Sequence, residues 1–379
     1  MKPLRIVHAL THNQVTRGGA IQALILARGQ EGQGHRVDVV VNSSNSKPLH
    51  QSFQPWQAQG LRLHPFNMIK KREMLRYRRF LAARHPDVVH VHRDVALTFT
   101  YFATPFATPP AFISQRGTTH PFRSRTVAYC HRSHKVHRII AVAEAVKQAL
   151  VSYGVSGDRI EVVYGSFDVD RFDPDRADRD RLRRELNLSA RDRLIVQVGE
   201  LHRKKAPAAF VDAAALLLRE RPELTFALVG KGKLRQQCEE RIAHWGVGER
   251  VKLLGFRTDI ADVYAAADIA VNSSTGHEGL TGALREALAM ARPVVATRVD
   301  GNPEAVKDGE TGLLVPPRDP EAMAKTISHL LDHPELAGRL GRAGRELILK
   351  TMHPTVRLAH TEQVYRSVLS RRRALSTAQ

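Results

Sequence analysis

Cysteine is scarce in this sequence: its 379 residues include only Cys130 and Cys238. Two cysteines exclude a disulfide framework and are typical of a protein from a reducing compartment. No apolar run approaches the roughly 18 residues that a membrane-spanning helix needs, and the apolar stretch that follows Met1 is too short for a signal peptide. We therefore expect a cytoplasmic protein, and peripheral attachment to the inner face of the cytoplasmic membrane stays open.

Acidic residues are few relative to basic ones. The chain has 58 Lys and Arg against 38 Asp and Glu, a formal net charge of +20. This excess favours a polyanionic partner: a phosphorylated small molecule, an anionic lipid surface or nucleic acid. Residues 70–84 contain seven basic side chains against one acid, and residues 116–138 contain six and no acid. A solvated charged face explains these segments as well as contact with anionic lipid or a phosphorylated glycolipid acceptor does.

Short β-branched runs alternate with helical patterns along the whole chain. A strand is expected at 6–10, a helix at 20–33 and a second strand at 37–41. Further strands are expected at 61–64, 87–91, 111–114, 138–141 and 159–163 and, beyond an irregular stretch at 164–180, at 194–198, 225–229, 251–254, 268–272, 293–297 and 312–315. This alternation predicts an α/β protein with two doubly wound parallel sheets, whose ligand lies in a cleft outside the strand ends. The tail, 333–370, is helical in pattern throughout.

The stretch NSSTGHEGLTGALREALAMARP, residues 272–293, organises the second half of the chain. Strand-like runs flank it, and the residues after Thr281 have helical apolar spacing, so the unit is strand, glycine-containing turn, helix, strand. Its turn directs backbone N–H groups and a positive dipole end toward any ligand above the sheet. Glu278 and Glu286 stand eight residues apart, about 12 Å along a helix. That is roughly the span of a nucleoside diphosphate between its ribose and an attached sugar.

This stretch, continued by PVVATRVDGNPEAVKDGETGLLVPP, resembles the donor-site region of glycosyltransferase family 4, retaining enzymes of GT-B fold. GGAIQALILARGQEGQGHRVDVVV and TFALVGKGKLRQQC resemble further blocks of that family. The resemblance implies two Rossmann-like domains that face a central cleft. We expect an acceptor-side domain at 1–164, a nucleotide-sugar-donor domain at 165–353, and a C-terminal helix at 354–379 that packs back on the first domain.

The resemblance also implies roles for the carboxylate stretch. Glu286 would accept hydrogen bonds from the ribose hydroxyls, and Glu278 would contact the transferred sugar. Gly279, Leu280 and Thr281 would offer backbone N–H groups to the sugar or the pyrophosphate. The alternatives are an exposed helix glutamate paired with a basic neighbour and a solvated loop acid.

Lys205, in GELHRKKAP, matches the family lysine that binds the donor phosphates. A cation is needed there because negative charge builds on the leaving diphosphate. The family usually has an arginine directly after the strand glycine, and this chain has Glu200 instead. Arg203 or Lys204 could supply that charge. Arg257, in a further matching block, is counted among the donor-binding residues.

In the first domain, Gly18 and Gly19 match a loop that approaches a phosphate closely, although an ordinary strand-to-helix turn would look the same. Arg116 stands where the family often has a histidine near the reacting sugar, and it could orient sugar or phosphate as a fixed charge. His120, four residues on, and His92 are further candidates.

These observations predict a retaining glycosyltransferase that moves a hexose from a nucleoside diphosphate sugar to a glycan or glycolipid acceptor. UDP-glucose or another UDP-sugar is the favoured donor. Lipopolysaccharide or another cell-envelope polysaccharide is the expected product, and the leaving phosphate is the expected base. We expect no metal and no other cofactor. A sugar-nucleotide epimerase of GT-B fold is the alternative. A basic nucleic-acid-binding protein is the second, although no recognition-helix signature is present, so nucleic acid is not an expected partner.

Overall fold

The computed structural model describes residues 2–15, 18–43, 49–104 and 110–377. The chain divides into two compact units: a first unit made of Met1–Ser166 and Pro354–Gln379, and a second unit made of Phe167–His353. The chain thus leaves the first unit after Ser166 and returns to it at Pro354.

The first unit is built on a parallel sheet of seven strands in the order β3-β2-β1-β4-β5-β6-β7. From β1 the chain adds strands on one side as far as β3 and then continues on the other side from β4, so the strand order reverses between β1 and β4. This is the switch point of a doubly wound sheet. Its strands are short and almost wholly buried, as apolar runs in parallel sheets are. They are β1 (Arg5–Leu10), β2 (Arg36–Asn42), β3 (Arg62–Phe66), β4 (Val88–His92), β5 (Ala111–Arg116), β6 (Arg138–Ala141) and β7 (Ile160–Val162).

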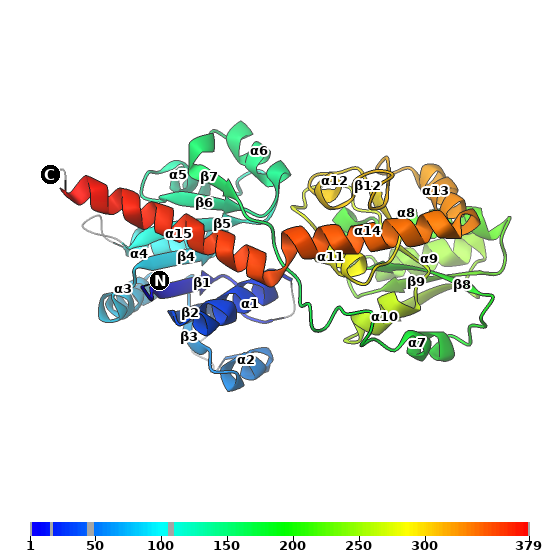
Figure 1. Cartoon of the computed structure of the whole chain (residues 1–379), viewed down its shortest axis with the longest axis horizontal. Coiled ribbons are helices and arrows are strands. Elements are labelled where there is room, and N and C mark those ends of the chain that lie inside the picture. The colour runs from blue at the N-terminus through cyan, green and yellow to red at the C-terminus, as the bar shows by residue number, and fades with distance from the viewer. Residues whose placement is uncertain (1, 16–17, 44–48, 105–109, 378–379) are drawn as a thin grey trace. The chain divides into compact units, whose positions relative to one another are not determined.

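The last helix of the chain, α15 (Pro354–Thr377), belongs to the first unit. It lies against α1 (Gly18–Gly32) and β5 (Figure 1). Val364, Tyr365 and Val368 join the core of that unit, and the Arg357 guanidinium donates to the Gln22 carbonyl at 2.6 Å. The remaining helices of the unit are α2 (Gln54–Ala58), α3 (Arg72–Arg84), α4 (Asp94–Ala103), α5 (Arg125–Arg132) and α6 (Glu144–Ser152), with 3₁₀ turns η1 (Gln51–Phe53) and η2 (Gly157–Arg159).

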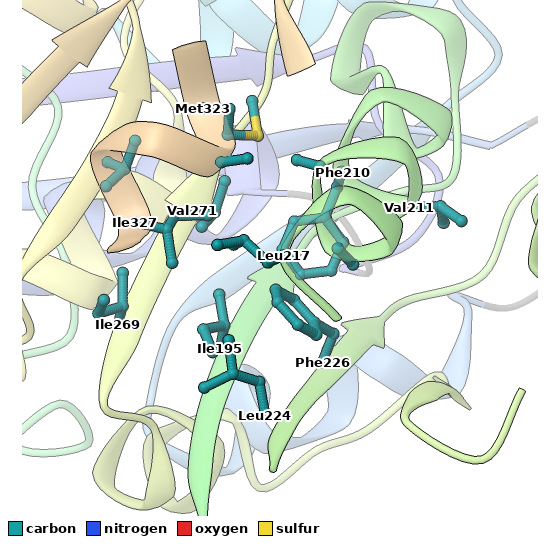
Figure 2. Packing of buried hydrophobic residues seen from close by; sticks show 14 of the residues in the cluster. Ile195, Phe210, Val211, Leu217, Leu224, Phe226, Ile269, Val271, Met323 and Ile327 are labelled. Carbon is teal, nitrogen blue, oxygen red and sulfur yellow. The ribbon is translucent and has the colours of Figure 1, made fainter. Parts of the chain in front are cut away.

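The second unit has a six-stranded parallel sheet in the order β10-β9-β8-β11-β12-β13. Its core lies between the sheet and helices α8 and α13, where Phe210, Phe226, Met323 and Ile327 pack together (Figure 2). The expectation of two parallel-sheet, Rossmann-like domains is confirmed. The strands are β8 (Arg193–Val198), β9 (Leu224–Val229), β10 (Val251–Gly255), β11 (Ile269–Asn272), β12 (Val294–Thr297) and β13 (Leu313–Val315).

The helical tail consists of two helices. They are separated at His353, which is extended (φ −61°, ψ 144°), as a residue before proline prefers to be. None of the described helices is both long and apolar enough to cross a bilayer. The helices of the second unit are α7 (Arg179–Glu185), α8 (Pro207–Leu218), α9 (Arg235–Trp245), α10 (Ile260–Ala266), α11 (Gly282–Ala289), α12 (Asn302–Ala305), α13 (Pro320–Asp332) and α14 (Pro334–Met352), with a 3₁₀ turn η3 (Arg203–Lys205).

Candidate active site

Helix α11 begins at Gly282, and Thr281 is its N-cap residue. The Thr281 hydroxyl accepts from the Leu284 N–H at 3.2 Å and from the Asn272 side-chain amide at 3.0 Å. The second bond ties the cap to the end of β11. Because a helix start leaves its first N–H groups without intrahelical partners, the fixed cap directs donors and the positive end of the dipole out of the sheet.

Glu278 lies before this helix, in a loop with unusual backbone geometry. Gly276 and His277 both have positive φ, at 126° and 60°. The Glu278 N–H donates to the Asp300 carboxylate at 2.9 Å, and the Gly279 carbonyl accepts from the Gly301 N–H at 3.0 Å. The loop is thus fastened to the segment that follows β12. Since Glu278 is not helical, the helical span between the two glutamates that the sequence predicted does not apply.

Lys205 ends the 3₁₀ turn that follows β8. Its carbonyl accepts from the Gln197 amide at 3.1 Å and from the Ser273 hydroxyl at 2.7 Å, which joins it to the ends of β8 and β11. Its side chain passes over Gly199, where a Cβ would lie 3.8 Å from the lysine Cδ. The ammonium forms an ion pair with Glu278, with Nζ and Oε1 3.1 Å apart. The structure therefore brings two of the predicted site residues into direct contact.

Glu286 sits one turn into α11, with its carboxylate against Gly282. A Cβ on Gly282 would lie 3.6 Å from Glu286 Oε1. Burial raises the pKa of Glu286, and the positive charges of Arg285, Arg171 and Lys205 act in the opposite direction. The charge of Lys205 thus acts on both predicted carboxylates, and the start of α11 lies beside them.

Two predicted donor-binding arginines are placed differently. Arg203 is exposed on the 3₁₀ turn. The Arg257 guanidinium binds Glu185 and Asp259, with closest approaches of 2.6 Å to each, and these contacts raise its pKa. Its charge is therefore already shared by two carboxylates. Lys204, the other candidate for the missing phosphate charge, donates to the His277 carbonyl at 3.2 Å and so touches the Glu278 loop.

The remaining predicted residues lie in the first unit. Gly18 and Gly19 open α1 and are exposed; Arg17 lies outside the described residues. Gly19 borders His12, because a Cβ on Gly19 would lie 3.2 Å from the His12 ring nitrogen Nε2. Contact of a ligand with these glycines stays a prediction.

Arg116 is 3% exposed, which the sequence did not predict for a ligand-binding arginine. Its guanidinium donates to Asp94 at 2.6 Å and to the carbonyls of Thr118 and His120. In the described structure Arg116 therefore holds the loop that follows β5, and half-buried His120 is part of that loop. Its effect on a substrate would be exerted by positioning this loop.

His92 belongs to a buried group with His8 and His90, whose ligand atoms lie within 4.8 Å of one another. His8 Nδ1 is 2.9 Å from His92 Nε2, and His8 Nε2 is 2.7 Å from the Gln30 side-chain oxygen. Burial lowers the pKa of His8 to about 4, and it also lowers those of His90 and His92 well below the ordinary value. His8 and His92 are joined by a hydrogen bond, and His90 Nδ1 lies 2.7 Å from the Tyr365 hydroxyl. The absence of a required metal stays a prediction.

Sequence reasoning missed Arg285. Position 285 was not singled out, but Arg285 is 5% exposed and is one of the buried residues of α11. The spacing offered a signal, because position 285 is three residues before the apolar Leu288 and so is its neighbour on the helix surface. Among the described residues, the structure records no hydrogen bond or ion pair for its side chain, and its Nε is fully buried.

Comparison with known proteins agrees with this fold. Residues 16–171 match the family described as Glycosyltransferase Family 4, and residues 192–333 match Glycosyl transferases group 1. The putative glycosyltransferase EpsD of Bacillus subtilis is 32% identical over 169 residues, which are 45% of this chain and 44% of that protein. The D-inositol 3-phosphate glycosyltransferase of Corynebacterium efficiens is 36% identical over 200 residues, 50% of this chain and 47% of that protein. The chain thus spans about half the length of the curated relatives that it matches.

Similarity to solved structures extends over almost the whole chain. Anabaena HepE in complex with UDP has a TM-score of 0.84 at 19% identity and covers 96% of this chain and 100% of its own. A glycosyltransferase from Rickettsia africae has a TM-score of 0.84 at 19% identity, with 97% and 99% covered. At this identity the likeness establishes the fold. Together with the two family matches, which lie in separate parts of the chain, this fold supports a GT-B glycosyltransferase of the group 1 and family 4 type.

Proposed function

We propose that this protein transfers a hexose from a nucleoside diphosphate sugar to an acceptor hydroxyl with retention of configuration. The observation that carries the proposal is the contact of Lys205 with Glu278 beside the capped start of α11. One place thus offers a cation and backbone donors for a diphosphate and a carboxylate for sugar hydroxyls. This is the donor set that a nucleotide sugar needs.

Each residue has a distinct part in the proposed reaction. As the glycosidic bond breaks, negative charge grows on the leaving diphosphate, and Lys205 and the first amides of α11 stabilise it. Glu278 accepts hydrogen bonds from the sugar hydroxyls, and Glu286 accepts them from the ribose. The leaving phosphate oxygen takes the proton of the acceptor hydroxyl on the same face of the sugar, which gives retention. We propose that no metal is required for this step.

UDP-glucose is the proposed donor to try first. Structures of HepE are described in complex with UDP and with UDP-glucose, and this chain shares their fold. The proposed acceptor is a glycan or glycolipid of the cell envelope, such as a lipopolysaccharide. The basic character of the first unit supports an anionic acceptor.

Helix α3 supplies a surface for such an acceptor or for the membrane that carries it. Lys70, Lys71 and Arg72 are exposed at its start, and the apolar Ile69 and Leu75 are 74% and 63% exposed beside them. Exposed apolar side chains among cations are typical of contact with anionic lipid. The second basic segment, residues 116–138, contributes less positive charge to the surface than its composition indicated, because Arg116 and Arg138 are buried.

The experiment that tests the function is a thermal-shift panel of nucleotides and nucleotide sugars, followed by a transfer assay with the tightest-binding donor. We expect a selective shift with one nucleoside diphosphate sugar. Glu286→Ala should abolish transfer and leave the circular dichroism spectrum unchanged. If no member of the panel shifted the melting temperature, or if the Glu286→Ala variant had near-normal turnover, the assignment would be contradicted. Conversion of the free nucleotide sugar without any acceptor would favour an epimerase.

A further inference from the structure

Arg285 is a buried cation without a bound partner in the part of the chain that the structure describes. It is 5% exposed, its Nε has no hydrogen-bond acceptor, and no ion pair joins its guanidinium to a carboxylate. Burial lowers its pKa to about 10, so the side chain is still charged at neutral pH. The negative charge of Glu286 offsets part of this effect. A buried guanidinium nitrogen without an acceptor is costly, because it has lost water and gained no hydrogen bond in return.

A second buried arginine of the same unit shows the usual arrangement. Arg183 is 8% exposed, and its guanidinium donates to the carbonyls of Ser189 at 2.8 Å, Asp192 at 2.7 Å and Ala266 at 3.2 Å. It also approaches the Asp268 carboxylate at 3.5 Å. Arg183 is therefore a structural arginine whose donors are used. Arg285 has the same burial and none of these contacts, which points to an acceptor that comes from outside the chain.

The Arg285 side chain folds back over the first turn of its own helix. A Cβ on Gly282 would lie 3.9 Å from an Arg285 terminal nitrogen and 3.6 Å from Glu286 Oε1. Because position 282 is a glycine, no side chain of its own stands between the guanidinium and the start of α11. The cation thus adds to the positive end of the helix dipole at the point where the first N–H groups emerge.

Two other predicted donor-binding cations, Arg257 and Lys205, are already engaged by carboxylates. Glu200 occupies the position of the expected arginine and is exposed. Arg257 is neutralised by Glu185 and Asp259. Lys205 is paired with Glu278. A diphosphate that carries more than one negative charge would therefore find a lysine shared with Glu278 and, at the start of α11, an arginine for which no ion pair is recorded among the described residues.

We propose that Arg285 binds a non-bridging oxygen of the donor's diphosphate at the start of α11, and so replaces the arginine that this chain lacks at position 200. This inference rests on the proposed function, because it requires a nucleoside diphosphate at that place. Arg285 is then a specificity residue: it favours nucleoside diphosphates over nucleosides without a charged group.

The test compares the Arg285→Met variant with the wild-type chain. Methionine keeps much of the buried volume and removes the charge. Titration calorimetry with UDP, or with GDP if the panel selects it, should show affinity weakened about 10- to 100-fold, the value of a charged hydrogen bond. Affinity for the corresponding nucleoside, which has no phosphate, should be unchanged. Arg285→Lys should recover part of the loss.

Stability gives a second and independent readout. Because the unliganded protein buries this charge without acceptors, Arg285→Met should raise the melting temperature by about 2–4 °C in the absence of nucleotide. Arg183→Met is the matched control. It removes an equally buried arginine that has acceptors, and it should lower the melting temperature.

The outcomes separate the two proposals. Unchanged UDP affinity in Arg285→Met, or equal losses for UDP and nucleoside, would overturn the role of Arg285 and leave the transferase proposal standing. A lower melting temperature in this variant would make Arg285 structural and overturn it as well. A wild-type chain that binds no nucleotide would overturn the proposed function and this inference together.

Discussion

The ammonium of Lys205 lies 3.1 Å from the carboxylate of Glu278, although the two residues follow different strands. Lys205 comes after β8 and Glu278 after β11, and these strands are neighbours in the sheet. The ion pair therefore holds the cation in place before any donor arrives. A bound diphosphate has to compete with Glu278 for this cation.

We expect Glu278→Gln to separate nucleotide binding from sugar transfer. Without the carboxylate, Lys205 is free for the phosphates, so affinity for UDP should stay equal or increase. Transfer from the nucleotide sugar should fall, because the hydroxyls of the sugar lose a charged acceptor. Calorimetry with UDP and a steady-state transfer assay measure the two effects. A parallel loss of both would contradict the competition between Glu278 and the diphosphate.

Lys205→Met should reduce kcat about 10²- to 10³-fold, the usual effect of removing one group that stabilises charge in a transition state. Lys205→Arg keeps a positive charge and should retain part of the activity. Lys252→Met, a lysine on β10 of the same unit, is the control and should behave as the wild type. If Lys205→Met changed KM alone, the lysine would bind the ground state without stabilising the leaving group.

Glu286 should make the stability of the second unit depend on pH. Burial raises its pKa above the ordinary 4.5, so the folded unit holds this proton more tightly than the unfolded chain and loses stability as pH rises through that range. Glu286→Gln should therefore unfold at a higher temperature than the wild type at pH 7 to 8. The difference should vanish below about pH 4. Melting curves of the two proteins across this pH range test the prediction. A difference in melting temperature that increased as the pH was lowered would contradict it.

The buried histidines should make the first unit sensitive to acid. Burial lowers the pKa of His8 from 6.5 to about 4, so the unfolded chain takes up this proton first. Stability is fully present above pH 6.5 and declines toward pH 4, by up to roughly 1.4 kcal/mol per pH unit for each such histidine. This loss of stability can be measured by hydrogen exchange of the β1 and β4 backbone amides at pH 7.5 and at pH 5. His8→Gln should flatten this slope, whereas replacement of exposed His134 should leave it unchanged.

The apolar and basic surface at the start of α3 should bind anionic vesicles. The combined variant Lys70→Gln, Lys71→Gln, Arg72→Gln should weaken binding by about fivefold for each charge, since a basic residue near such a surface contributes about 1 kcal/mol. Arg339→Gln with Arg342→Gln, two exposed arginines of α14, is the control. Sedimentation with anionic and zwitterionic vesicles distinguishes the cases. Equal losses in both sets of variants would mean that net charge alone drives binding.

Much of the fold followed from the sequence because strands of a parallel sheet are buried on both faces. Runs such as 37–41 and 194–198 are therefore continuous and easy to recognise, and the observed strands begin or end within two residues of the expected ones. The start of α11 was equally clear, since Thr281 is a good cap after a glycine-containing loop. The last helix begins at Pro354, and a proline at that position favours an extended residue before it.

The site was predictable only in part. Glu278 and Lys205 were each identified from a resemblance, but their contact depends on which strands are neighbours. The burial of Arg116 and Arg285 was not predicted, for a shared reason: a charged side chain is assumed to face water unless its partners are known. For Arg116 the partners are Asp94 and loop carbonyls, which no local pattern reveals.

Helix α15 has a consequence for how this chain is made. Most of the first unit precedes the second in the chain and is synthesised before it, yet Val364 and Tyr365 join the core of the first unit, and His90 Nδ1 lies 2.7 Å from the Tyr365 hydroxyl. The second unit is continuous in sequence, from Phe167 to His353. On the ribosome it can therefore finish folding while the unit begun before it still awaits its last helix. The half of the protein that is translated first is the half that is completed last.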